Sequence, residues 1–229
     1  MTTKIRFTAV TIAWTEGGIL HLGIRASAES KISIAWGDGR RIMHFFNDDT
    51  EEVVFRHDYY AKHPTARPPQ EFDGKKFYVE IRAKTLDCRI LGFRVEDDMD
   101  AVDLDLSNCP ELEYLHYSAN NMHRMSTLDL SHNTALKYLN CRINGFESLD
   151  LSNNTALEEL YCISNRLRHL SLYNNRNLKY LDCRFNNMEK IFISYAPQLI
   201  GADIEDGNNL DKASKMRIQD ILAENAEYN

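Results

Sequence analysis

Three of the five cysteines stand 21 residues apart, at Cys141, Cys162 and Cys183, within the similar stretches LNCRIN, LYCISN and LDCRFN. Cysteine thiolates bind zinc, form disulfides and carry out redox reactions, so an even spacing raises each of these possibilities. The spacing also fits a repeating fold that needs a small apolar side chain at the same point of every repeat. The choice between chemistry and packing depends on the elements that hold these residues.

The sequence from Leu104 onward is a tandem repeat. Similar segments begin at Leu104, Leu128, Leu149, Leu170 and Ile191, so the steps between them are 24, 21, 21 and 21 residues. A fixed period of this size is typical of a solenoid, in which stacked units bury a core that a single unit could not bury. The cysteines therefore have to be interpreted as members of this repeat.

Each unit contains the pattern L-x-x-L-x-C-x-x-N-x-L, which is the leucine-rich-repeat pattern. In the third unit its positions are Leu157, Leu160, Cys162, Asn165 and Leu167. With the added segment LDLSNNT, the repeats resemble those of bacterial surface proteins of the internalin-like type over about residues 104 to 210. The resemblance implies an extracellular or cell-envelope setting. The fifth unit departs from the pattern at Ala202 and Gly207.

In such a repeat the stretch around L-x-C forms a short parallel strand whose alternate side chains point into the core. The predicted core column is Tyr117, Cys141, Cys162, Cys183 and Ile204. Its two ends are apolar, which indicates that the position selects apolar bulk. In-register parallel strands give poor disulfide geometry, and a line of three thiols lacks the tetrahedral ligand set of zinc. We therefore predict buried, reduced cysteines and neither a metal nor a cofactor.

Two sets of asparagines repeat with the same period and are predicted to be structural. Their amides can bond backbone groups that a turn leaves unpaired. The first set follows the strands and comprises Asn120, Asn144, Asn165 and Asn186. The second set comprises Asn133, Asn154 and Asn175. It follows the LDL segments, which we expect to form the opposite side of the solenoid.

Residues 1–97 alternate apolar and polar side chains with a period of two, between stretches of turn residues. The expected strands are residues 4–14, 19–26, 31–36, 41–46, 53–59, 77–83 and 88–95. This pattern predicts an antiparallel β-sandwich. On WGDG (36–39), HDY (57–59) and YVEIRA, this half resembles a PKD-like domain, an immunoglobulin-type sandwich. A proline-containing insertion at residues 61–76 departs from that pattern.

The predicted architecture is mainly β, in two domains. An N-terminal antiparallel β-sandwich occupies residues 1–97, and residues 98–229 form a short solenoid of five repeats of about 21 residues. A C-terminal helix over about residues 211–225 is expected to cap the solenoid, because exposed solenoid ends need a cap. Asp211 or Ser214 can begin this helix.

The outward positions of the repeat strands are the candidate binding residues. They are Tyr114, His116, Tyr138, Asn140, Arg142, Glu159, Tyr161, Ile163, Tyr180, Asp182, Arg184 and Phe185. Tyrosine and arginine dominate binding hot spots, and exposed apolar side chains such as Ile163 and Phe185 favour a partner. The competing interpretation is that outward aromatic side chains only stabilise the sheet by cross-strand pairing.

We expect that the chain is not an enzyme. It is predicted to be a recognition module that binds a protein or peptide. The alternatives are a cell-surface glycan-binding protein and a structural spacer in a surface assembly. The net charge of −7 disfavours nucleic acid, and no apolar run approaches the ~18 residues of a membrane helix. The G-x-S-x-G, H-E-x-x-H, phosphate-loop and C-x-x-C motifs are absent, and His57 is expected in the core.

Two further expectations concern single segments. The first residues, MTTKIRFTAVTIAW, lack the pattern of a leader. That absence fits a cytoplasmic chain or a mature chain whose leader was removed, and the sequence does not separate the two. The acidic residues Asp48, Asp49, Glu51 and Glu52 lack the ordered spacing of a calcium loop and are expected to form a solvated turn.

Overall fold

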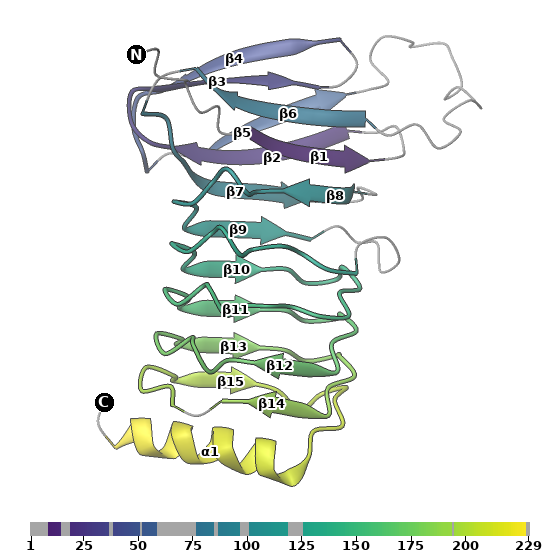
Figure 1. The fold of residues 1–229 in the computed structure, drawn as a ribbon, viewed down its shortest axis with the longest axis vertical. Helices are drawn as coiled ribbons and strands as arrows, with labels where there is room; N and C mark the ends of the chain where they lie inside the picture. The colour runs from purple at the N-terminus through teal and green to yellow at the C-terminus, as the bar shows by residue number, and fades with distance from the viewer. Residues whose placement is uncertain are drawn as a thin grey trace, which may run out of the picture.

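The structure is a computed structural model that describes residues 9–14, 19–36, 39–50, 52–58, 77–84, 87–96, 101–118, 126–193 and 195–227. The predicted insertion at 61–76 lies outside these residues, as do Asp38, Tyr59 and Asn120. The described chain is mainly β. An N-terminal unit of two sheets leads into a β-solenoid of about five turns, and a helix closes the far end (Figure 1).

Strands occupy the seven N-terminal stretches in which alternation predicted them, and an eighth strand lies in a stretch that was assigned to the solenoid. They are β1 (Ala9–Trp14), β2 (Ile19–Ala26), β3 (Ser30–Ala35), β4 (Arg41–Phe46), β5 (Val53–Asp58), β6 (Phe77–Ala83), β7 (Ile90–Glu96) and β8 (Ala101–Asp105). One sheet has the order β4-β3-β6-β1-β8, and β5-β2-β7 begin the other. Trp36 and His57 are buried, and their rings stack with centroids 4.4 Å apart. His57 is therefore a core histidine, as predicted.

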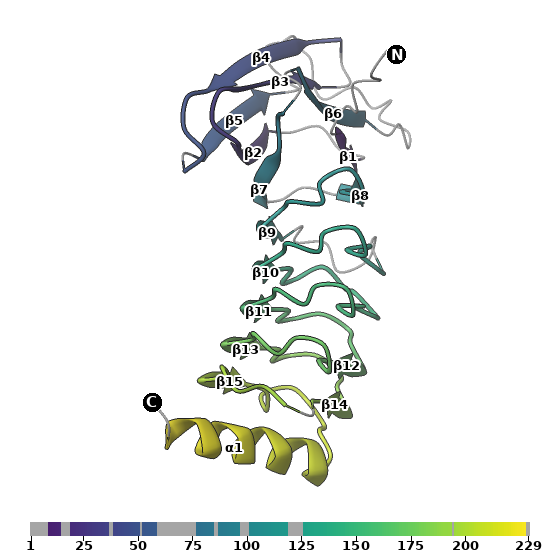
Figure 2. The same cartoon turned by 60° about the vertical axis from the view of Figure 1, so that its left-hand side comes forward.

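The solenoid has one strand per turn on its main side. These strands are β9 (Tyr114–Tyr117), β10 (Tyr138–Asn140), β11 (Glu159–Tyr161), β13 (Tyr180–Asp182) and β15 (Gly201–Asp203). They pair in parallel and in the register that the repeat predicts, so Leu139 lies between Leu115 and Leu160. On the opposite side, β12 (His169–Ser171) pairs with β14 (Lys190–Phe192), as Figure 2 shows. The expected second side of the solenoid is therefore present.

Two strand pairs join the N-terminal unit to the solenoid. β7 pairs in parallel with β9, which sets Gly92 beside Tyr114, and β8 pairs antiparallel with β1. One sheet consequently runs through the order β15-β13-β11-β10-β9-β7-β2-β5. Backbone hydrogen bonds therefore connect residues on either side of the predicted domain boundary at residue 97. The division of the chain into two domains stays a prediction.

The predicted core column is buried throughout. Tyr117, Cys141, Cys162 and Cys183 have no exposed surface, and Ile204 is 5% exposed. A repeating strand places the same backbone position in the same place in each turn, so the five side chains stack along the solenoid axis. The regular spacing of the cysteines is thus a consequence of the repeat.

Asparagines link each turn of the solenoid to the next. The buried Asn165 amide donates to the carbonyls of Cys141 and Cys162 at 2.9 and 3.0 Å, and its Oδ1 accepts the Phe146 N–H at 3.0 Å. The second set is equally buried: Asn154 donates to the carbonyls of Leu130 and Asn133. Both predicted asparagine columns are confirmed for the described residues.

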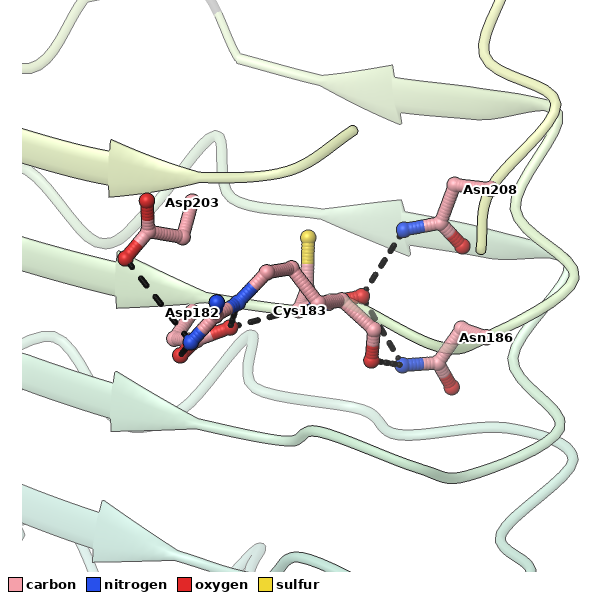
Figure 3. A network of polar contacts seen from close by, with 6 residues as sticks. Asp182, Cys183, Asn186, Asp203 and Asn208 are labelled. Carbon is pink, nitrogen blue, oxygen red and sulfur yellow. Dashed lines mark hydrogen bonds and ion pairs between the residues drawn. The ribbon is translucent and has the colours of Figure 1, made fainter. Parts of the chain in front are cut away.

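The last turn keeps this link one residue later than the repeat predicts. Gly207 occupies the repeat position, and Asn208 makes the bonds, donating to the carbonyls of Cys183 and Ile204 at 2.9 Å each. Figure 3 shows Asn186 and Asn208 reaching the backbone around Cys183. The departure at Gly207 is thus a shift by one residue, which the left-handed backbone of Gly207 (φ +69°) accommodates. Ala202 stays in register beside Leu181, so at that position the fifth unit does depart from the pattern.

The C-terminal helix, α1 (Lys212–Ala226), covers the last turn. Asp211 caps it by accepting the Ser214 N–H at 2.8 Å, so the alternative cap at Ser214 is wrong. Ser214 is instead buried, and its hydroxyl accepts the Ile191 N–H at 3.1 Å. Ile218 and Ile221 are buried against the solenoid end. The helix therefore supplies the apolar cover that an open solenoid end lacks.

The turn at Gly207 gives a first stability prediction. A Cβ at Gly207 would lie 2.8 Å from the Phe185 Cα, whereas a Cβ at Gly39 (φ +89°) meets no described atom within 4 Å. Both alanine variants incur the left-handed backbone cost of about 1–2 kcal/mol. Only Gly207→Ala adds a clash, typically about 1–3 kcal/mol. In urea unfolding, Gly207→Ala should therefore lose clearly more stability than Gly39→Ala. Equal losses of stability in the two variants would show that Phe185 moves away from the added Cβ at little cost.

Candidate binding face on the solenoid sheet

The outward side chains of the sheet β9 to β15 form two rows, which we call the strand face. One row contains Tyr114, Tyr138, Glu159, Tyr180 and Gly201, and the other contains His116, Asn140, Tyr161, Asp182 and Asp203. Parallel in-register pairing puts each residue beside the equivalent residue of the next turn. The structure therefore brings the predicted strand residues onto one continuous surface.

The tyrosines of the strand face contact one another. The rings of Tyr114 and Tyr138 stack with centroids 4.5 Å apart, and Tyr161 lies 5.6 Å from Tyr138 in a tilted arrangement. The Tyr161 hydroxyl donates to Glu159 Oε2 at 2.9 Å. Tyr180 is 42% exposed and lies over Gly201, where an added Cβ would come within 3.2 Å of its ring. Cross-strand pairing thus occurs on the face, and it leaves these rings only half-buried or exposed.

Tyr114 and Tyr161 remain protonated over the physiological range. Burial raises the pKa of Tyr114 and of Tyr161 to about 12. For Tyr161, the hydrogen bond to the Glu159 carboxylate raises the pKa further, because that bond favours the neutral phenol. The Tyr161 proton is held by Glu159, so this hydroxyl can accept a hydrogen bond from a partner, and the neutral phenols of Tyr114 and Tyr161 add no negative charge to the strand face.

The C-terminal end of the strand face carries an ion-pair network. Arg184 donates from Nε and Nη2 to the two carboxylate oxygens of Asp182, at 3.0 and 2.7 Å, and Nη2 lies 4.0 Å from Asp203 Oδ2 (Figure 3). The hydrogen bond to Asp182 raises the pKa of the Arg184 guanidinium. Asp182 and Asn140 are themselves buried. Each therefore acts on the surface through its neighbour: Asp182 holds Arg184, and Asn140 accepts the Arg142 N–H at 3.4 Å.

The turns after β10, β11 and β13 each hold an ordinary residue in a conformation that favours glycine. Ile143, Ser164 and Phe185 have φ values of 57°, 55° and 54°. Such a backbone costs about 1–2 kcal/mol for a residue with a side chain. Phe185 is in addition 55% exposed, whereas the predicted Ile163 is half-buried. Of the two predicted apolar contacts, Phe185 is the more accessible.

The surface continues into the N-terminal unit, which sequence reasoning missed. Through β7, Arg94 lies beside His116, and Arg25 lies beside Gly92, which in turn neighbours Tyr114. Arg94 pairs with Glu52 at 2.5 Å, and Arg25 with Glu113 at 3.4 Å. No repeat signal marks β7, because its sequence follows the antiparallel pattern of the first half. Only the parallel pairing with β9 adds Arg25 and Arg94 to the face.

The cysteines lie beneath this surface and take no part in it. All five are free and buried, and burial raises the pKa of Cys141 and Cys183 to about 12. No group of histidine, cysteine and carboxylate side chains within the described residues could hold a metal ion. At the predicted acidic turn, the exposed Asp48 accepts the Thr50 N–H and hydroxyl at 2.7 Å each, which is a turn-forming contact.

Comparison with known proteins gives one structural similarity. No protein-family model matches the chain, and the search of curated proteins found no match. Among solved structures, the chain is similar to the functional domain of InlJ from Listeria monocytogenes, described as including a cysteine ladder, with 21% identity and a TM-score of 0.28. The similarity covers 48% of this chain and 38% of that chain. No helix in the described part of the chain is long and apolar enough to cross a membrane.

Proposed function

We propose that the chain is a non-catalytic recognition module that binds a protein or peptide through the strand face. The observation that carries this proposal is the exposed combination on one flat surface of Tyr180, Phe185 and Arg142 beside the half-buried Tyr114 and Tyr161. Aromatic and arginine side chains supply most of the binding energy at protein interfaces. An exposed apolar ring on a strained turn is typical of a binding surface.

Protein is favoured over glycan as the partner by the arrangement of the rings. Sugars stack on free aromatic faces, but the faces of Tyr114 and Tyr138 stack on each other at 4.5 Å. A partner would therefore contact the edges and hydroxyl groups of these two rings, through apolar contacts and hydrogen bonds. The glycan-binding and spacer alternatives remain as outcomes of the experiment below.

We also propose a family for the chain. We infer an internalin-like surface protein whose first half is PKD-like, acting in the cell envelope or outside the cell. The LDLSNNT repeats support the first part. The second part is supported by the meeting of its two motif stretches, since Trp36 of WGDG stacks on His57 of HDY at 4.4 Å.

A charge-and-aromatic double variant tests the face. Tyr161→Ala with Arg142→Glu should weaken binding of a partner selected from a displayed peptide library by at least about 30-fold, the effect of a hot spot of about 2 kcal/mol. Binding is measured by calorimetry with the purified chain. A glycan array probed in parallel reports on the sugar alternative.

The matched control lies on another side of the same solenoid. Tyr173→Ala with Arg176→Glu changes the same residue types at two exposed positions outside the strand face, so it should keep affinity within about threefold. Melting temperatures of both variants are measured alongside. If the two double variants lose affinity equally, or if no library selects a binder, the proposal is wrong. Binding on the glycan array alone would then support the glycan alternative, and no binding in either screen would support the spacer.

A further inference from the structure

The strand face ends at a hollow between β15 and α1. The hollow has a volume of about 350 Å³. Its apolar lining consists of Ala202 and Ile204 from the last turn and of Ile218 and Leu222 from the helix. Ala202 and Leu222 are only half-buried, so part of this apolar lining meets solvent. The volume lies at the lower end of the about 300–1,000 Å³ that ligand pockets span.

Carboxylates surround this apolar lining. Asp203, Glu205 and Asp206 all border the hollow and are exposed. The guanidinium of Arg184, the cation that borders the hollow, is bonded to both oxygens of Asp182 and reaches Asp203 only at 4.0 Å. The Asp203 side chain accordingly stays 68% exposed. Lys215 lies 3.7 Å from Glu205, so the three carboxylates face two cations, Arg184 and Lys215, and the rim of the hollow stays negative.

We propose that this hollow receives an arginine or lysine side chain of the protein or peptide that binds the strand face. The inference rests on the proposed function, because it assigns a chemistry to one end of that same face. The alkyl stem of a basic side chain packs on apolar surface while its charged head stays at the polar edge. Here the stem would contact Ala202 and Leu222, and the head would meet Asp203 and Asp206 in charge-assisted hydrogen bonds.

Phe185 adds a second contact for the same kind of side chain. Its N–H donates to the Asp206 carbonyl at 2.6 Å, and an added Cβ at Gly207 would lie 2.8 Å from its Cδ1. The exposed ring therefore stands next to the acidic rim. A cation over an aromatic face is attracted by the ring's quadrupole, and guanidinium groups stack on such rings most often. A peptide with a basic residue consequently fits this end better than an acidic one.

Short peptides test the proposal without knowledge of the partner. The ¹⁵N-labelled chain is titrated with acetyl-Gly-Ser-Arg-Ser-Gly-amide, with its lysine analogue, and with the citrulline analogue, which keeps the shape of arginine and lacks its charge. The arginine and lysine peptides should shift the amide signals of Asp203, Gln219 and Leu222. The citrulline peptide should bind at least tenfold more weakly.

Two double variants separate a specific contact from general charge attraction. Asp203→Asn with Asp206→Asn should weaken binding of the arginine peptide at least tenfold. Glu147→Gln with Glu189→Gln removes the same charge at exposed positions that do not line the hollow, and should change binding less than twofold. Equal weakening by both pairs, or citrulline binding as tightly as arginine, overturns the proposal. The proposal is also overturned if the signals of Asp203, Gln219 and Leu222 broaden as the protein concentration rises in the absence of peptide. Such broadening would show that a second copy of the chain occupies the hollow.

Failure here is distinguishable from failure of the strand-face proposal. If the arginine peptide does not bind but Tyr161→Ala with Arg142→Glu still abolishes partner binding, only the hollow is rejected. If the peptide binds in the hollow and that face variant keeps full affinity for its partner, the strand face is rejected.

Discussion

Replacing Asn165 by alanine should lower the free energy of unfolding by about 3–5 kcal/mol. The amide donates to two buried carbonyls, those of Cys141 and Cys162, and its oxygen accepts the N–H groups of Asn144 and Phe146. Each buried polar group left without a partner costs about 1–3 kcal/mol. Urea unfolding followed by circular dichroism measures the loss, and the whole transition is compared, because repeat proteins do not always unfold in two states.

Asn153 provides the matched control in the same repeat. It is exposed, and its amide makes a hydrogen bond of 3.3 Å to the Ser131 carbonyl. Asn153→Ala should therefore cost less than about 0.5 kcal/mol, as surface substitutions usually do. A further variant, Asn165→Asp, keeps the shape but replaces the donor by an oxygen facing two carbonyls, so it should be at least as damaging as alanine. Comparable losses for Asn165→Ala and Asn153→Ala would refute the structural role of the ladder.

Cys141 and Cys183 should react with a thiol reagent at least about a thousandfold more slowly in the folded chain than in denaturant. The attacking species is the thiolate, and burial raises the pKa of Cys141 and Cys183 to about 12, whereas an exposed thiol titrates near 8.5. At pH 8 the thiolate fraction therefore falls by about three orders of magnitude, before any loss of access is counted. Absorbance of released thionitrobenzoate measures both rates.

Thr155→Cys is the control for reagent access, because Thr155 is exposed on a turn of the same repeats. That variant should release one equivalent within minutes in the folded state and six in denaturant, five of them from the natural cysteines. Rapid release from the natural folded chain would mean that the cysteine column opens readily, and it would restore a redox role as a possibility.

The sequence-based predictions agree with the structure at positions that have the same environment in every turn of the solenoid. The period of the repeat already placed Cys162 in the core, Asn165 in the turn and Tyr161 on the surface, because a stacked strand repeats its environment. The capping helix was also predictable, since a solenoid end needs cover and the residues from Asp211 supply a start signal and an apolar face. The departure from the repeat was local, because Asn208 takes over the bonds expected at the position of Gly207. Of the two predicted helix caps, Asp211 is the one that forms.

The amino-acid sequence by itself determined the solenoid, its core column and most of its outward residues, because these follow from periodicity along one chain; Asn140 and Asp182, predicted to face outward, are buried. Tertiary structure decided the pairing of β7 with β9, which brings Arg25 and Arg94 onto the strand face, and the hollow between β15 and α1. The physical reason is that neither feature repeats. A contact between two different elements, such as β7 and β9, depends on how their surfaces fit together. The hydrophobic pattern within each element is the same whether or not the two elements are in contact, so the sequence does not reveal the contact.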